Sequence, residues 1–231
     1  MQDITIRPIA RIHTDFSSKF GIPRQSNLVE ELEGAIVFEN EFRNPDAVRG
    51  LSDFTYIWLI FGFSECERDN WKATVNPPKL DKNERKGVFA TRSPYRPNPL
   101  GLSSVKLISV EEDEKNGPII RVSGADLLDG TPIYDIKPYI PYGDSHPEAA
   151  NGFAEDYVND RLEVLVPENL IEMIPTEKRK ALVNVLSLDP RPSYMNYADR
   201  RYGIEFAGFD VRFYVNVKKL EVCEIERLND V

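Results

Sequence analysis

The chain has 231 residues, with 29 Lys and Arg against 38 Asp and Glu, so its formal net charge at pH 7 is −9. Hydrophobic residues make up 41% of it and charged residues 29%, which excludes a disordered chain, because such chains lack the apolar content for a core. The acidic excess argues against a generally basic nucleic-acid-binding domain.

The length predicts one large domain, or one domain followed by a smaller one. The only cysteines are Cys66 and Cys223, without a C-x-x-C motif, which favours a reduced, cytoplasmic protein. Residues 1–12 lack the basic and apolar pattern of a signal peptide. The longest apolar run, residues 54–63, is far shorter than the ~20 residues of a membrane helix, so no membrane association is expected.

The first half of the chain reads as short strands separated by Pro, Gly and Asn. They are expected at residues 4–12, 35–38, 54–63, 102–110 and 118–123. Because no long helix intervenes, the pattern favours an antiparallel barrel or sandwich over a doubly wound parallel sheet.

The second half changes character at a polar linker, residues 142–151. We therefore expect two domains, residues 1–145 and 146–231. A strand is expected at 161–166 and helices at 167–174 and 176–188, the second with Thr176 as N-cap. Strict alternation over 210–218, followed by 220–225, predicts a hairpin around Lys218 and Lys219. The second domain is thus a small α+β unit.

Several catalytic classes have no motif here. The two histidines, His13 and His146, cannot readily build a zinc site with two distant cysteines. The chain holds neither a G-x-S-x-G nucleophile elbow nor a glycine-rich phosphate loop.

Three segments are richer in rigid and polar residues than folding requires. Residues 87–101 place Arg92 and Arg96 among three prolines, which suits binding of a carboxylate, a phosphate or an aromatic face. A proline-rich turn with surface arginines would look the same. Residues 189–197 place Arg191 beside Tyr194 and Tyr197, as RNA-loop binders do, although a helix stop and turn also explain them.

The third segment, residues 126–144, interleaves aspartates with tyrosines. Its carboxylates suit a ribose diol or an amino group, and its tyrosines suit a base. A polar meander between strands is the alternative interpretation. A metal-dependent hydrolase using Asp129 and Asp135 is another, but the spacing is not diagnostic of a metal site, and none is predicted.

Five strings together resemble the TsaA-like (TrmO) family of tRNA methyltransferases. They are FGIPRQ at 20–25, AVRGL at 47–51, GVFATRSPYRPNPLG at 87–101, DLLDGTPIYDIKPYIPY at 126–142 and DPRPSY at 189–194. The resemblance implies a mainly β fold, an antiparallel β-barrel methyltransferase domain followed by a small C-terminal domain. It also implies S-adenosylmethionine as cofactor, a homodimer, and a tRNA substrate. The acceptor would be the exocyclic nitrogen of threonylcarbamoyladenosine next to the anticodon.

Carried over by position, the resemblance implies a set of cofactor-binding residues. These are Pro23, Arg24, Gln25, Ser64, Glu65, Arg92, Ser104, Asp126, Leu127, Leu128, Asp129 and Gly130. Many relatives have His-Gln where this chain has Ser64-Glu65, which weakens that part of the assignment.

Arg191 and Tyr194 are the expected tRNA contacts or catalytic helpers. Since a carbonyl substituent makes the acceptor nitrogen a poor nucleophile, we expect a general base, with Tyr134 and Asp135 as candidates. Arg92 or Arg191 could pair with the threonyl carboxylate.

The charge is unevenly distributed. Residues 79–96 hold six basic side chains against two acidic ones. This confined patch predicts RNA contact with few phosphates. Without the resemblance, a non-catalytic barrel module that binds RNA or a small anionic ligand remains the alternative function.

Overall fold

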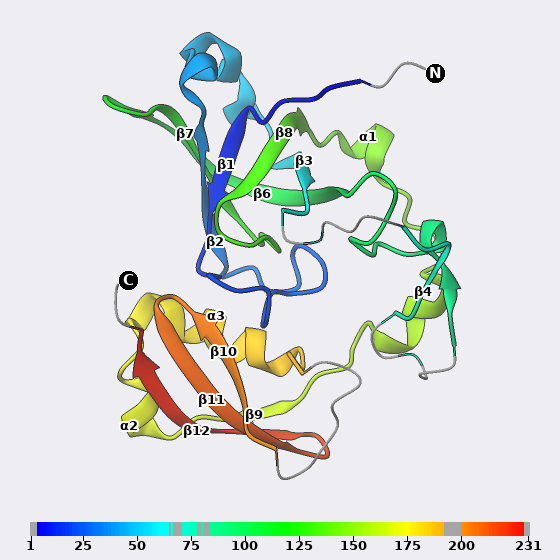
Figure 1. The fold of residues 1–231 in the computed structure, drawn as a ribbon. Coiled ribbons are helices and arrows are strands. Elements are labelled where there is room, and N and C mark those ends of the chain that lie inside the picture. The colour runs from blue at the N-terminus through cyan, green and yellow to red at the C-terminus, as the bar shows by residue number, and fades with distance from the viewer. Residues whose placement is uncertain are drawn as a thin grey trace.

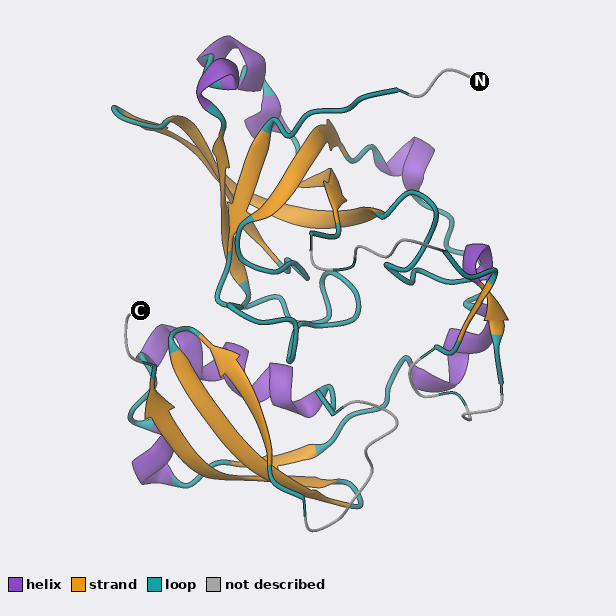
Figure 2. Ribbon diagram, in the orientation of Figure 1, coloured by secondary structure: helices purple, strands orange, loops and turns teal. Residues whose placement is uncertain are grey.

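The computed structural model describes residues 4–64, 66, 71–77, 80, 84–191 and 200–228, without the side chains of 156 and 157. The predicted site residues Glu65 and Tyr194 lie outside the described residues. The structure is mainly β, with a closed barrel and a separate α+β domain (Figures 1 and 2). This confirms the predicted fold class.

The barrel is closed by antiparallel pairing in the order β1-β2-β7-β6-β3-β8. Alternate side chains point inward, and Ile12, Ile57 and Val105 are fully buried in its core. The strands are β1 (Ala10–His13), β2 (Glu33–Phe38), β3 (Tyr56–Gly62), β6 (Leu100–Asp113), β7 (Gly117–Ser123) and β8 (Thr131–Pro138).

The barrel differs from the sequence expectation at two strands. β1 begins only at Ala10, so residues 4–9 of the expected strand are not part of it. β8 closes the barrel, although its polar sequence TPIYDIKP looks like a loop. β8 is a strand because it pairs with β1 on one side and β3 on the other, and both of these partners are distant in the sequence.

Short elements connect the strands. The hairpin β4 (Thr74–Val75) and β5 (Lys86–Gly87) stands beside the barrel, near η5 (Figure 1). The short helices are η1 (Asn40–Phe42), η2 (Pro45–Val48), η3 (Leu51–Asp53), η4 (Val88–Ala90), α1 (Pro141–Asp144) and η5 (Gly152–Tyr157).

The second domain is a sheet of order β10-β11-β12-β9 packed against helices. Its elements are β9 (Glu163–Leu165), α2 (Glu168–Ile171), α3 (Thr176–Ser187), β10 (Tyr202–Phe206), β11 (Phe209–Asn216) and β12 (Lys219–Arg227). The predicted apolar face of α3 is buried, but the N-cap is Pro175 and not Thr176. The hairpin turn comes one residue early, because Val217 has φ 53° and is 86% exposed. None of the described helices is long and apolar enough to cross a membrane.

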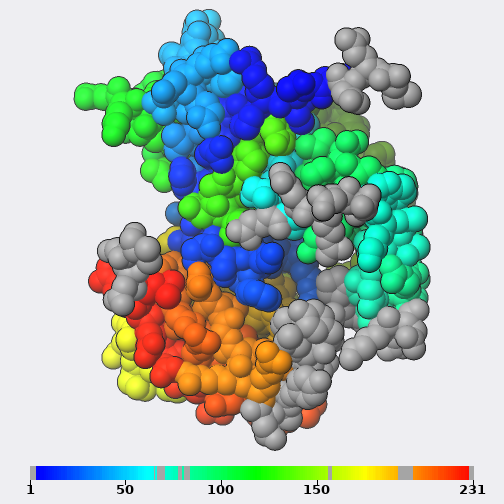
Figure 3. Space-filling model, viewed as in Figure 1, coloured from blue at the N-terminus to red at the C-terminus, as the bar shows by residue number. Residues whose placement is uncertain are grey.

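The connection between β1 and β2 enters the core of the second domain. Phe16, Val29 and Leu32 are buried in the same cluster as α3 and β10–β12, and the Phe16 ring packs edge-on against Phe206 at 5.6 Å. In the space-filling view, the blue N-terminal region lies directly on the orange strands (Figure 3). The second domain therefore holds a loop that belongs, by sequence, to the first.

Candidate active site

The β1–β2 connection brings Gln25 to the proline-rich loop that follows η4. Arg92 donates a hydrogen bond from Nη1 to Oε1 of Gln25. Internal hydrogen bonds hold the loop, since the Ser93 amide donates to Thr91 Oγ1 at 3.3 Å and Arg96 Nη1 donates to the Thr91 carbonyl oxygen at 3.1 Å. Two of the predicted cofactor residues, far apart in sequence, are thus adjacent in space.

Asp126 lies within electrostatic range of Arg92. Its Oδ1 is buried and has no hydrogen-bond partner in the described part of the chain. Burial raises the pKa of this carboxyl above its ordinary value, against the opposing effects of hydrogen bonds from Ser103 and Ser26 and of the Arg92 charge. A buried acceptor without a donor is costly, so this oxygen is suited to a ligand hydroxyl or amino group.

Ser104 lies in the first part of β6, which has no pairing with β7. The last β7 residue, Ser123, pairs with Lys106, so β7 leaves the Ser104 edge of β6 uncovered. Asn27 Nδ2 donates to Ser104 O at 2.9 Å. Asn27 itself has φ 61°, and its amide bonds Gly124 O at 2.9 Å. The loops that carry Gln25 and Asp126 are therefore joined at this edge.

Tyr134 lies at a β-bulge. Ile60 pairs with Asp135 and Phe61 with Ile133, which leaves Tyr134 as the extra residue of β8. A Cβ on Gly62 would lie 2.8 Å from Tyr134 Oη, so the ring covers the end of β3. Ser64 is exposed two residues further on, and the neighbouring Phe63 amide bonds Pro99 O at 2.9 Å. Bulges often re-aim a side chain at functional sites.

The adjacent Asp135 is already engaged. Its Oδ1 accepts from the Ile136 amide at 2.9 Å, and its Oδ2 pairs with Lys137 Nζ at 2.8 Å. The Asp135 carboxylate therefore already has two partners among the described residues. This makes Tyr134 the stronger of the two general-base candidates.

The remaining residues of the 126–130 turn anchor it to β1. Leu127 is buried in the barrel core, and Leu128 O accepts from Thr131 Oγ1 at 2.7 Å. Asp129 Oδ1 accepts from the Thr14 amide at 3.0 Å and contacts His13 Nδ1 at 3.2 Å. Gly130, at φ 74°, donates to Ile12 O. The side chain of Asp129 is thus directed at the end of β1.

The start of the DPRPSY string faces the same loop region. Arg191 forms a two-point ion pair with Asp189, 2.8 Å at both Nε and Nη2, and its side chain is only 11% exposed. Asp189 also attracts Arg24, whereas Pro23 is buried. Arg191 therefore has a structural partner, and Tyr194 lies outside the described residues.

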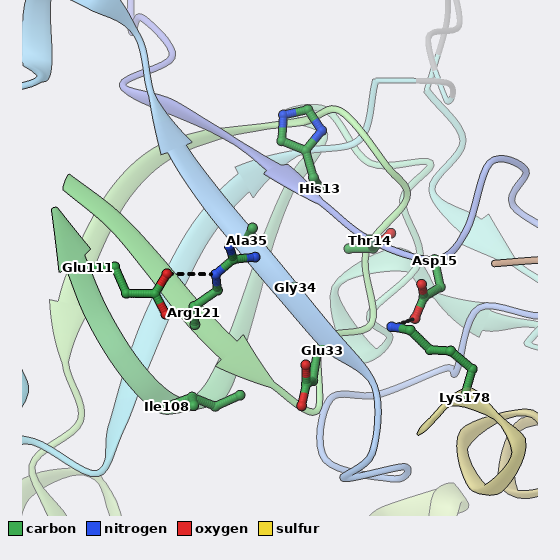
Figure 4. Close-up of a pocket in the computed structure, with 10 residues that line it drawn as sticks. All are labelled: His13, Thr14, Asp15, Glu33, Gly34, Ala35, Ile108, Glu111, Arg121 and Lys178. Atoms are coloured by element: carbon green, nitrogen blue, oxygen red, sulfur yellow. Dashed lines mark hydrogen bonds and ion pairs between the residues drawn. The ribbon is translucent and has the colours of Figure 1, made fainter. Parts of the chain in front are cut away.

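A cavity of about 530 Å³ opens elsewhere, between the barrel and α3 (Figure 4). Its charges are largely paired, with Arg121 on Glu111 at 3.2 Å and Lys178 on Asp15 at 2.6 Å. None of the predicted cofactor residues lines it. Among the described residues, no group of three His, Cys, Asp or Glu side chains is placed to hold a metal ion.

Sequence reasoning missed Ser26, Asn27 and Ser103, which brace Ser104 and Asp126. Their only sequence signal is the Ser-Asn pair directly after the FGIPRQ string. Ser103 carries none, because its inward position on β6 depends on strand register.

The chain was compared with known proteins. The family model described as tRNA-methyltransferase O N-terminal domain matches residues 11–145, and that of the TrmO C-terminal domain matches residues 163–228. A relative from Escherichia coli named tRNA (adenine(37)-N6)-methyltransferase is 36% identical over 98% of this chain and 99% of its own. A mouse protein of the same name is 39% identical over 62% of this chain and 32% of its own. A crystal structure of TrmO from Pseudomonas aeruginosa is 31% identical, covers 98% of both chains and superposes with a TM-score of 0.78. This chain therefore belongs to the TrmO family.

Proposed function

We propose that this protein transfers a methyl group from S-adenosylmethionine to the exocyclic nitrogen N6 of adenosine 37 in tRNA, and that this adenosine already carries a threonylcarbamoyl group. The observation that carries the proposal is the convergence of Gln25, Arg92 and Asp126 at one site. This convergence occurs in a chain that aligns end to end with a tRNA (adenine(37)-N6)-methyltransferase.

The polar groups at this site match the cofactor's chemistry. The buried Asp126 Oδ1 is an acceptor for a ribose hydroxyl or an amino group. Ser104 lies at the uncovered edge of β6, and Gln25 presents an amide to the same loop cluster. Pro23 and Arg24 directly precede Gln25 in the chain, and Leu127 to Gly130 shape the turn that carries Asp126. We assign Ser64, after β3, to the same site. Glu65, outside the described residues, keeps the role expected from the resemblance.

When bound, S-adenosylmethionine supplies a methyl group on a sulfonium sulfur, which would leave as a neutral thioether, a good leaving group. The protein must therefore mainly align donor and acceptor, an effect that can lower the barrier by as much as ~7–11 kcal/mol. It must also accept the proton of the acceptor nitrogen. We place Tyr134 first for this role, because its ring covers the end of β3 beside Ser64, and Asp135 second, because Lys137 and the Ile136 amide already hold it.

We propose Arg92 as the partner of the threonyl carboxylate. Arg191 is the second candidate, because Asp189 holds two of its nitrogens. Arg191 and Tyr194 are proposed to help position tRNA from the second domain. A planar guanidinium can bind a carboxylate at two points, which Lys cannot reproduce.

We further propose a homodimer whose contact includes the outward face of β6. Leu100, Leu102 and Ile108 alternate along this face and are 39%, 56% and 50% exposed. Ser104 lies between them, so a second copy placed there would border the cofactor site. Sedimentation velocity on Leu102→Lys tests this, since a monomer with an intact fold is expected and an unchanged dimer would contradict it.

We place the protein in the cytoplasm, where tRNA is modified. In the described structure neither cysteine forms a disulfide, which accords with a reducing compartment. We also propose a domain division after residue 145, at the exposed segment between α1 and η5.

The deciding experiment is transfer of labelled methyl groups to tRNA prepared with and without the threonylcarbamoyl group. We expect transfer only to the modified tRNA, with strong loss in Arg92→Ala. Arg121→Ala is the matched control, because Arg121 pairs with Glu111 at the cavity that none of the predicted cofactor residues lines. A non-catalytic module would give no transfer and no calorimetric signal with S-adenosylmethionine.

A further inference from the structure

An exposed pair of aromatic rings stands at the open end of the β4–β5 hairpin, outside the candidate active site. Trp71 is 52% exposed and Phe89 is 72% exposed. Their ring centroids are 6.2 Å apart and their planes are tilted by 31°. Rings this exposed bury little apolar area and so contribute little to the stability of the fold. A pair of exposed apolar rings therefore suggests a contact with another molecule.

The backbone of the hairpin brings the two rings together. The hairpin pairs Thr74 with Gly87, and the next backbone bond runs from the Val88 amide to Ala73 O at 2.9 Å. Trp71 and Phe89 follow directly at this end. η4 then leads within three residues to Arg92, so the Cα atoms of Phe89 and Arg92 lie at most about 11 Å apart.

The sequence around the rings is rich in basic residues. Residues 71–96 hold seven Lys or Arg against two Asp or Glu, in a chain whose net charge is −9. The Arg85 guanidinium is fixed by two hydrogen bonds of 2.8 Å to Thr74, through Nε and Nη2. Its Nη1 has no hydrogen-bond partner among the described residues, which leaves a donor edge for an anion.

Exposed rings beside fixed cations are the combination that binds unpaired nucleotides, because bases stack on the rings while phosphates pair with the cations. The tilt between the rings does not favour a base sandwiched between them, so a base would add to an outer face of the pair. We propose that Trp71 and Phe89 form a stacking platform for an unpaired base of the substrate's anticodon loop, with Arg85 on the adjacent phosphate. The inference rests on the proposed function for its RNA substrate.

The test measures RNA binding by the full chain, without methyl transfer. The probe is an RNA hairpin with an anticodon stem and loop, and a fully paired duplex of equal length is the control. We expect the hairpin to bind about tenfold more weakly to Trp71→Ala and to Phe89→Ala. Trp71→Phe and Phe89→Tyr should keep most of the affinity, whereas Phe89→Leu should not. Tyr214→Ala, which removes an exposed aromatic ring from β11, should bind normally.

Fluorescence gives a second readout. The only tryptophans are Trp58 and Trp71, so hairpin binding should quench emission in the wild-type chain and far less in Trp71→Phe. Unchanged affinity in the Trp71→Ala/Phe89→Ala double variant would overturn the proposal. If the ring variants lose RNA binding and also change from dimer to monomer, the rings are a contact between two copies of the chain. That outcome would also overturn the proposal.

The two proposals fail separately. If the rings belong to the platform alone, the double variant keeps the wild-type affinity for S-adenosylmethionine in calorimetry. Loss of that affinity would instead assign the rings to the cofactor site and overturn the platform. Absence of methyl transfer in the wild-type chain would refute the proposed function, while ring-dependent hairpin binding would still support the platform.

Discussion

Arg92 donates a hydrogen bond from Nη1 to Oε1 of Gln25, joining two residues that lie 67 positions apart in the chain. The bond connects the loop after η4 to the β1–β2 connection, which the second domain holds through Phe16. Each of these loops therefore depends on the other for its position at the candidate site.

This link predicts energetic coupling in cofactor binding. Gln25→Ala and Arg92→Ala should each raise the Kd for S-adenosylmethionine, and the double variant should lose about 1 kcal/mol less than the sum of the singles. Isothermal titration calorimetry on the four chains measures this. Strictly additive losses would show that the two side chains act independently.

The raised pKa of Asp126 predicts a specific pH dependence of stability. In the folded state the pKa of Asp126 lies above its ordinary value of 3.8. The free energy of unfolding therefore falls as the pH rises from 3.8 through the pKa of the folded state. Asp126→Asn should remove this loss, and should be more stable than the wild type at neutral pH while binding S-adenosylmethionine more weakly.

Urea unfolding at a series of pH values measures the effect. Glu33→Gln, at the exposed start of β2, is the control and should leave the slope unchanged. Parallel pH profiles for the wild type and Asp126→Asn would contradict the assignment of a buried carboxyl with a raised pKa.

Asn27 has two separable contributions. Asn27→Gly loses only the side-chain bond to Ser104 and should cost about 1 kcal/mol of stability. Asn27→Ala keeps a Cβ at φ 61° without the polar side chain that makes this conformation tolerable for Asn, and should cost about 1–2 kcal/mol more than Asn27→Gly. Gly124→Ala should be severe, because its Cβ would lie 2.5 Å from Asn27 Oδ1. Equal stability of the Gly and Ala variants in urea would refute the backbone argument.

Tyr134→Phe should lower kcat by about 10²–10⁴ without changing the Kd for S-adenosylmethionine. Asp135→Asn should have the smaller effect, because its carboxylate is bound to Lys137. Single-turnover methyl transfer to modified tRNA measures both. Near wild-type turnover in both variants would end the proposal of a base in this strand.

The affinity for tRNA should depend only weakly on salt. The confined basic segment around Arg85 and Arg92 suits contact with about three to four phosphates, which predicts a slope of about −3 in log K against log salt concentration. A slope typical of ~10 neutralised phosphates would show a wider basic surface than the sequence and the described structure provide.

Local patterns in the sequence predicted much of the fold. Apolar runs identified β2 and β3, alternation identified β6 and β11, and the 3.6-residue period identified α3, because these segments each bury one face. The short segment after an acidic turn identified β7. The polar strand β8 was missed, since its burial depends on pairing with β1 and β3 and not on its own pattern.

By itself, the sequence determined the family, the mainly β fold and the set of candidate residues, because those properties reside in contiguous strings. Only the tertiary structure decided which candidates meet. It joined Gln25 to Arg92, left Asp126 Oδ1 buried without a partner, turned Asp129 toward β1 and engaged Arg191 with Asp189. The physical reason is that these contacts depend on strand register, a β-bulge and a loop packed into another domain's core. Such relations join residues distant in the chain, and no local period encodes them.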